Sequence, residues 1–151
     1  MNVLEHLEPK SVFRFFEEMC AIPHGSRNTK AVSDWCADFA RARGLEYHQD
    51  GDNNIIIIKE AAPGYEAAPP VILQGHLDMV CEQTADCQKD MSREGLDLAV
   101  DGDFVYAKGT TLGGDDGIAV AMALALLDAE GLPHPRLEAV FTVDEEIGLL
   151  G

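Results

Sequence analysis

The sequence has few basic residues, no Cys-x-x-Cys pair and no long apolar run, and each absence excludes a class of protein. Only 11 lysine and arginine residues accompany 27 aspartate and glutamate residues, so the formal net charge is −16. We therefore expect no nucleic-acid partner and no association with anionic membranes. No apolar run approaches the roughly 18 residues of a membrane-spanning helix, and the first residues lack the basic and apolar parts of a secretory signal. A cytoplasmic location is expected.

Other frequent kinds of site are also missing. The four cysteines are too few and too widely spaced for a disulfide scaffold or a Cys-x-x-Cys site, and Cys20 and Cys36 fall on apolar helical positions, where cysteine is a small core residue. The chain contains no G-x-S-x-G, no H-E-x-x-H and no G-x-G-x-x-G after a strand. Serine-hydrolase, zincin and dinucleotide-binding chemistry thus have no motif here.

Hydrophobic periodicity predicts helices and strands that alternate as in an α/β fold, with no internal repeat. The first two helices are expected to begin at the N-caps Ser11 and Asn28 and to end at Pro23 and Gly44. A third helix is expected at 118–128, and strands are expected at 45–48, 55–58, 71–73, 96–100, 104–107 and 137–143.

A histidine and an aspartate follow one of these strands. The apolar run 71–73 predicts a buried strand, and His76 comes directly after it, where open α/β sheets place their ligand crevices. Asp78 is two residues further on, so both side chains point to one side if the chain stays extended. A carboxylate there can hold the second imidazole nitrogen and fix its tautomer. Taken alone, such a pair is more often structural.

A glycine-rich loop carries the second acidic pair. Gly109 and Gly114 have the spacing of a phosphate-binding loop, but Asp115 and Asp116 stand where that loop needs Lys and Ser or Thr. Two carboxylates repel a phosphate and attract a cation. One of them could instead be a helix N-cap, which explains the second less well.

Three consecutive acids, Asp144 to Glu146, close the strand 137–143. Such carboxylates repel one another unless they are solvated or share a cation. Together with the pairs His76/Asp78 and Asp115/Asp116, Glu145 and Glu146 supply the His, Asp and Glu ligands typical of a zinc or manganese hydrolase. A two-metal site would need a bridging carboxylate, a ligand on either side and a spare glutamate as general base.

Three segments, 71–81, 109–118 and 141–148, resemble the aminoacyl-histidine dipeptidases (Xaa-His dipeptidases, peptidase D) among the co-catalytic zinc peptidases. The resemblance implies an α/β zinc-peptidase catalytic domain, a three-layer mixed sheet with helices on both faces. It further implies that residues 1–151 are the N-terminal part of that domain. The remainder of the domain and a lid domain used for dimerisation would be absent.

The same resemblance assigns roles to five residues. His76 would bind one zinc ion, Asp115 would bridge two, and Glu146 would bind the second. Asp78 would orient His76, and Glu145 would be the general base that takes a proton from water. Two zinc ions are expected per complete site, and manganese or cobalt could replace them.

Two positions depart from the family pattern. The family has Asn where this chain has Asp116 and Ala where it has Gly114, and the first change adds negative charge near the metals. The resemblance also implies a cis peptide bond between Asp115 and Asp116.

We therefore expect a zinc-dependent dipeptidase that acts on short peptides, Xaa-His dipeptides in particular, and is a homodimer in a full-length form. A related zinc aminopeptidase or deacylase is the alternative among enzymes. A non-catalytic acidic fragment that binds metal weakly is the alternative from another class. Because the family's further ligands would lie beyond Gly151, we expect weak, single zinc binding and negligible peptidase activity from this chain alone.

Overall fold

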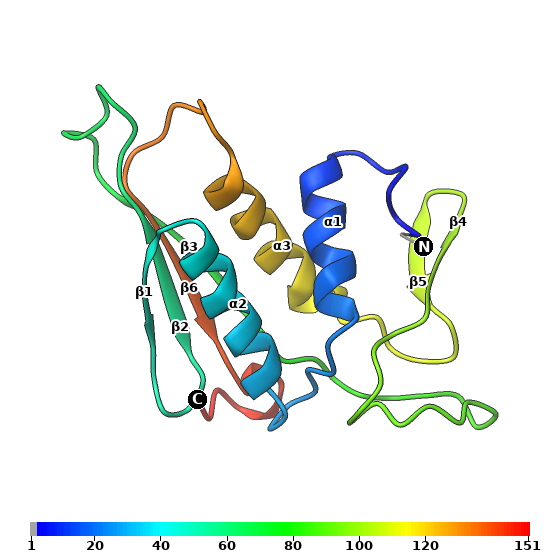
Figure 1. Ribbon diagram of the computed structural model, residues 1–151. Coiled ribbons are helices and arrows are strands. Elements are labelled where there is room, and N and C mark those ends of the chain that lie inside the picture. Colours follow the sequence, from blue (N-terminus) through cyan, green and yellow to red (C-terminus); the bar gives the residue numbers. More distant parts are fainter. Residues whose placement is uncertain (1–2) are drawn as a thin grey trace.

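The computed structural model describes residues 3–151, and Figure 1 shows two sheets with three α-helices beside them. Every helix and strand predicted from periodicity is present, with small shifts of the ends. In chain order the elements are α1 (Lys10–Cys20), α2 (Lys30–Ala42), β1 (Glu46–Gln49), β2 (Ile55–Lys59), β3 (Val71–His76), β4 (Leu98–Asp101), β5 (Phe104–Ala107), α3 (Gly114–Asp128), β6 (Leu137–Thr142) and the 3-10 turn η1 (Glu145–Ile147).

The larger sheet is mixed, as predicted, with strand order β1-β2-β6-β3. β2 is antiparallel to both β1 and β6, whereas β3 and β6 are parallel and connected through α3. In the parallel pair His76 is opposite Thr142, so the carboxyl ends of β3 and β6 meet at one edge of the sheet. β4 and β5, which correspond to the strands predicted at 96–100 and 104–107, pair antiparallel and form a separate two-stranded sheet.

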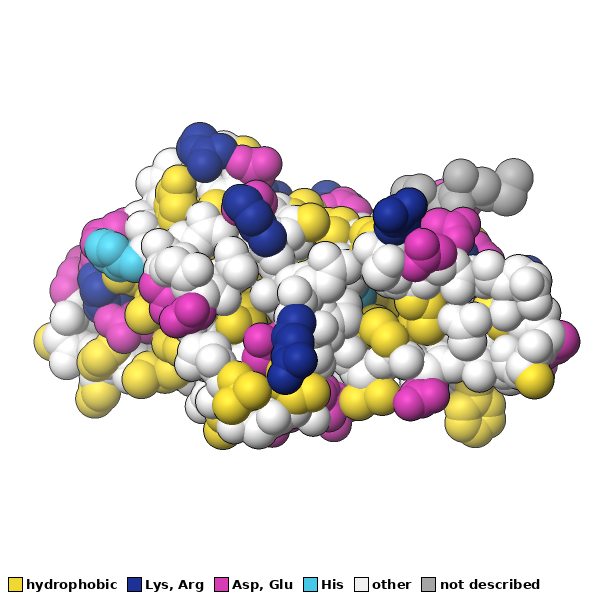
Figure 2. Space-filling view, turned by 90° about the horizontal axis from the view of Figure 1, so that it is seen from below, with side chains coloured by type: hydrophobic (Ala, Val, Ile, Leu, Met, Phe, Trp, Pro, Cys, Tyr) yellow, Lys and Arg dark blue, Asp and Glu magenta, His cyan; other side chains and the backbone are white. Residues whose placement is uncertain are grey.

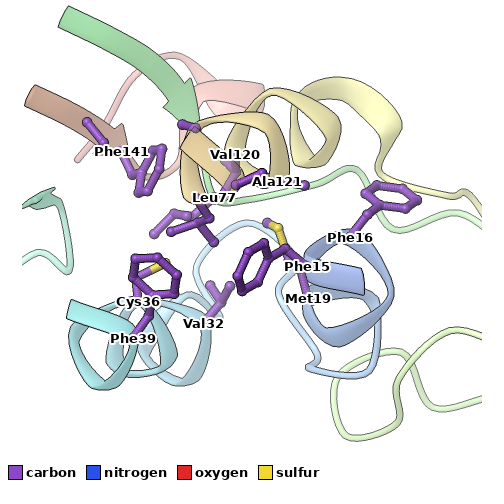
Figure 3. Packing of buried hydrophobic residues seen from close by; sticks show 14 of the residues in the cluster. Phe15, Phe16, Met19, Val32, Cys36, Phe39, Leu77, Val120, Ala121 and Phe141 are labelled. Atoms are coloured by element: carbon purple, nitrogen blue, oxygen red, sulfur yellow. The ribbon is translucent and has the colours of Figure 1, made fainter. Parts of the chain in front are cut away.

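One face of the larger sheet carries the core. Gln49 of β1 donates a hydrogen bond to Ser33 of α2, and a Cβ atom added to Gly75 of β3 would meet Val120 of α3. Since Gln49 and Gly75 lie in one paired row across the sheet, α2 and α3 cover the same face. α1 packs against α3, and Figure 3 shows side chains from all three helices in one cluster with Leu77 and Phe141.

The opposite face has no helix over it within residues 3–151. Ile56 on this face is 36% exposed and Ile72 is 63% exposed. The α/β class and the mixed sheet are confirmed, but the described chain forms two of the three expected layers. The reason is topological: the crossover through α3 and the helix α2 both fall on one side, and residues 3–151 contain no further helix to cover the other.

A single carboxylate at the end of α3 joins the three helices. Asp128 accepts hydrogen bonds from Arg14 of α1 at 2.8 Å and from Arg43, directly after α2, at 2.7 Å. Burial raises the pKa of Asp128, but the two guanidinium groups outweigh it, and the net pKa is lowered. The Arg43 guanidinium also lies 3.8 Å from the centre of the Phe39 ring.

None of the helices in the described range is long and apolar enough to cross a membrane.

Candidate metal centre

His76 is the last residue of β3, which extends three residues beyond the predicted strand 71–73, and it is 8% exposed. Its Nδ1 atom lies 3.0 Å from the backbone oxygen of Asp78 and 3.4 Å from the Asp78 carboxylate. The tautomer is therefore held mainly by the backbone carbonyl rather than by the carboxylate. With Nδ1 donating to Asp78, the Nε2 atom faces Asp115, whose Oδ1 lies 3.0 Å away.

Charges around His76 favour its protonated form. Burial lowers the pKa of His76, but the hydrogen bonds to Asp78 and Asp115 and the negative charges of Asp78 and Asp116 outweigh it. The net pKa is raised above the ordinary histidine value. The same charges that stabilise a proton on the imidazole would stabilise a divalent cation at Nε2.

Asp115 and Asp116 lie in an irregular segment where α3 begins. Gly113 has a left-handed backbone (φ 69°), and both aspartates have non-helical backbone angles. The peptide bond between them is cis, as the resemblance implied. The Asp115 side chain is 86% exposed, whereas Asp116 turns back so that its Oδ2 atom accepts a hydrogen bond from the His76 backbone at 3.3 Å.

The turn after β6 presents the third acidic group. Asp144 has a left-handed backbone (φ 55°), and Glu145 and Glu146 follow in η1. Their backbone N–H groups donate to the two oxygens of the buried Asp78 carboxylate, at 3.0 and 3.3 Å. Burial, together with the Asp115, Glu145 and Asp78 carboxylates, raises the pKa of Glu146 despite the opposing effect of His76. Glu146 is thus held among like charges.

His76, Asp115 and Glu146 come from β3, the start of α3 and η1, and each offers one ligand atom within 4.8 Å of the others. Two ligands about 2.0–2.1 Å from a tetrahedral zinc ion are roughly 3.3 Å apart, close to the His76–Asp115 separation. One imidazole and two carboxylates form a donor set that suits zinc or manganese. Figure 2 shows acidic side chains scattered over the face seen from below, so convergence, not charge alone, distinguishes this group.

Glu145 lies beside this group, with its Oε2 atom 3.7 Å from His76 Nε2. All five residues singled out in the sequence thus lie together at the edge where β3 and β6 end. The roles assigned to them by resemblance remain predictions.

No family model matches the chain. Its sequence is 38% identical over 151 residues to the cytosol non-specific dipeptidase of Escherichia coli. Its structure is similar, with a TM-score of 0.95 and 36% identity over 98% of the chain, to an aminoacylhistidine dipeptidase from Vibrio alginolyticus. The predicted resemblance to the aminoacyl-histidine dipeptidases is confirmed.

The chain spans about a third of these dipeptidases, 31% of the E. coli protein and 30% of the Vibrio chain. A tripeptidase from Staphylococcus aureus shares the fold, with a TM-score of 0.72 at 21% identity. The match to the two dipeptidases includes every segment that carries the candidate metal ligands, since it covers all or nearly all of the chain.

Two residues near the site had no signal in the sequence. The hydroxyl group of Ser26 donates to Asp78 Oδ2 at 2.7 Å, across 52 residues of chain. The backbone N–H of Arg27 donates to Asp144 Oδ1 at 2.6 Å. Both lie in the loop between α1 and α2, a segment that falls between the two predicted helices. Neither motif nor periodicity could show that this loop reaches the dipeptidase-like segments.

Proposed function

We propose that this chain supplies the metal ligands of a zinc-dependent dipeptidase and is the N-terminal part of its catalytic domain. The observation that carries the proposal is the convergence of His76, Asp115 and Glu146, with ligand atoms within 4.8 Å. The similarity to two dipeptidases supports it independently.

The three ligands have distinct places in this proposal. His76 would hold one zinc ion through Nε2, Glu146 would hold the second, and Asp115 would lie between them. Asp115 is the most exposed of the three, so its carboxylate can be reached by metal ions from solvent. The chemistry that zinc supplies, when bound, is activation of a water molecule and polarisation of a peptide carbonyl.

Glu145 is the proposed general base. It belongs to the same turn as Glu146 but is not a member of the three-residue ligand group, and its side chain is 43% exposed. A carboxylate beside the metals that is not consumed as a ligand can accept a proton from water and return it to the leaving amine. Asp78 would position His76 through its carbonyl and the turn of Glu145 and Glu146 through its carboxylate.

We propose short peptides as substrates. The name of the Vibrio relative favours Xaa-His dipeptides. The name of the E. coli relative, a non-specific dipeptidase of the cytosol, favours a wider range of dipeptides and a cytoplasmic location. A homodimer of a full-length form rests on the family resemblance alone.

The ligand count limits what residues 1–151 can do. A catalytic zinc ion has about three protein ligands, whereas His76, Asp115 and Glu146 give each of two ions only two, with Asp115 shared. We propose that this chain binds one zinc ion weakly and hydrolyses peptides negligibly unless further ligands join it.

Calorimetric titration of the 151-residue chain with zinc tests the metal site, and a weak site of one ion per chain is the expected result. No heat of binding, with a folded protein, would overturn the proposed centre. Two tight sites would overturn the ligand count. For a longer form that carries this chain, release of free histidine from Xaa-His dipeptides tests the activity, and unrelated dipeptides measure its range.

A further inference from the structure

The loop between α1 and α2 contacts the metal centre through the Ser26 side chain. Ser26 donates its hydroxyl hydrogen to Asp78 Oδ2 at 2.7 Å, the shortest hydrogen bond that this carboxylate accepts. Asp78 is only 1% exposed, so no solvent can replace that donor without a rearrangement.

Backbone pairing fixes where the Ser26 hydroxyl lies. The segment 24–26 runs parallel to the chain that leaves β3: Met79 N–H donates to the His24 carbonyl at 3.1 Å, and Ser26 N–H donates to the Met79 carbonyl at 3.3 Å. This backbone pairing therefore fixes the position of Ser26, and with it the position of the hydroxyl group beside Asp78.

The Asp78 carboxylate divides its two oxygens between segments far apart in the sequence. Oδ1 accepts the Glu145 N–H at 3.0 Å, and Oδ2 accepts both the Ser26 hydroxyl and the Glu146 N–H, the latter at 3.3 Å. Without Ser26, Oδ2 would keep only the longer of its two bonds. The carboxylate would then be held only by the N–H groups of Glu145 and Glu146, and the turn that carries Glu146 would be anchored less firmly.

A second contact joins the same loop to the same turn. Arg27 N–H donates to Asp144 Oδ1 at 2.6 Å, and both residues have left-handed backbones, with φ of 66° and 55°. Non-glycine residues in that region persist where the surrounding structure holds them. The loop thus contacts the turn directly at Asp144. Through Asp78 it is also connected to Glu145 and Glu146.

We propose that Ser26 is a positioning residue of the metal centre, which holds Asp78 so that Glu146 stays at ligand distance from His76 and Asp115. This inference rests on the proposed metal site. Ser26 touches neither substrate nor metal in this proposal; it acts through Asp78, as outer partners of metal ligands do.

Zinc affinity of the chain, measured by calorimetry, tests the inference. Ser26→Ala should weaken zinc binding by about tenfold or more, the usual effect of losing an outer hydrogen-bond partner. Ser26→Thr keeps the hydroxyl and should bind close to wild type. Ser26→Cys, similar in size with a weak donor, should fall between them. Ser92→Ala is the matched control, because Ser92 also donates to a carboxylate, Asp90, but on an exposed loop.

Unfolding of the metal-free variants separates positioning from simple support of the fold. If Ser26 only supports the fold, Ser26→Ala lowers the unfolding midpoint while the folded protein binds zinc as wild type does, and the inference is overturned. If Ser26→Ala does not fold, the order of zinc affinities among wild type, Thr and Cys decides the matter, and equal affinities overturn it. A wild-type chain that binds no zinc overturns the metal site itself.

Discussion

The Nε2 atom of His76 lies 3.0 Å from Asp115 Oδ1, although 39 residues separate them in the sequence. The contact exists because β3 ends where α3 begins its irregular first turn, beside the turn that follows β6. A hydrogen bond can join the two atoms at this distance. A zinc ion, which prefers tetrahedral ligands, could take the place of the shared proton with little movement of either side chain.

His76→Ala should therefore remove zinc binding from the measurable range, because it deletes the one nitrogen ligand of the group. His48→Ala is the control: His48 Nε2 lies 2.9 Å from the Glu46 carboxylate, but both side chains are well exposed. Calorimetric titration of both variants with zinc measures the difference. Zinc binding that survived in His76→Ala would contradict the assigned ligand.

Glu145→Gln and Glu146→Gln should have opposite effects. Glu146→Gln should weaken zinc binding, whereas Glu145→Gln should retain zinc and, in a complete enzyme, lower turnover by about 10²–10⁴-fold as a lost general base does. Zinc titration of this chain and turnover of a longer form report the two effects separately. The reverse outcome, zinc lost with Glu145→Gln and kept with Glu146→Gln, would exchange their roles.

Gly75→Ala should destabilise the fold mainly through contact with Asp116. A Cβ atom at Gly75 would lie 2.9 Å from Asp116 Oδ2, which leans against the end of β3. Overpacking of this kind costs about 1–3 kcal/mol. Gly51→Ala is the control, because nothing lies within 4 Å of its added Cβ, and a loss within about 0.5 kcal/mol is expected. Urea unfolding of the metal-free protein measures both.

The Asp116→Ala background tests the cause. There the Gly75→Ala change should cost clearly less, since the atom it meets is gone. An equal cost in both backgrounds would show that Asp116 is not the source of the strain.

Local sequence patterns were sufficient to predict the helices and strands but not the residues that cap the helices. Val12, Phe15 and Met19 are buried on one face of α1, as their spacing predicted. The N-cap predictions were wrong: Pro9 and Thr29 occupy those positions rather than Ser11 and Asn28. Asn28 instead donates its side chain to the Ser92 carbonyl, 64 residues away, a tertiary contact that no local pattern reports.

The candidate site, too, could be predicted from the sequence only in part. Each acidic cluster was visible because polar residues stand directly after an apolar strand or in a glycine-rich loop. Their meeting depends on the parallel register of β3 and β6, which places His76 opposite Thr142. Ser26 had no signal, because its contact with Asp78 is set by the backbone pairing of a loop, and a lone serine before a helix is ordinary.

The acid stability of the fold should depend on Asp128. Its folded-state pKa is lowered by Arg43 and Arg14, so its contribution is present above the unfolded pKa of about 3.9 and is lost as pH falls through the lower folded value. Asp128→Asn keeps the shape of the side chain but removes the negative charge that pairs with the guanidinium groups of Arg14 and Arg43. The variant should lose about 1.5–3 kcal/mol of unfolding free energy at neutral pH, the usual worth of hydrogen bonds to a charged group.

The difference between wild type and Asp128→Asn should shrink as pH falls below about 4, because the wild-type carboxyl is protonated first in the unfolded state and, at lower pH, in the folded state as well. Asp34→Asn is the control. Its carboxylate pairs with Lys30 at i, i+4 on an exposed surface, where such a pair contributes about 0.3–0.5 kcal/mol. Urea unfolding at several pH values follows both variants. A pH-independent loss in Asp128→Asn would show that the carboxamide merely packs badly between the helices, and that the charge shared by α1, α2 and α3 contributes nothing.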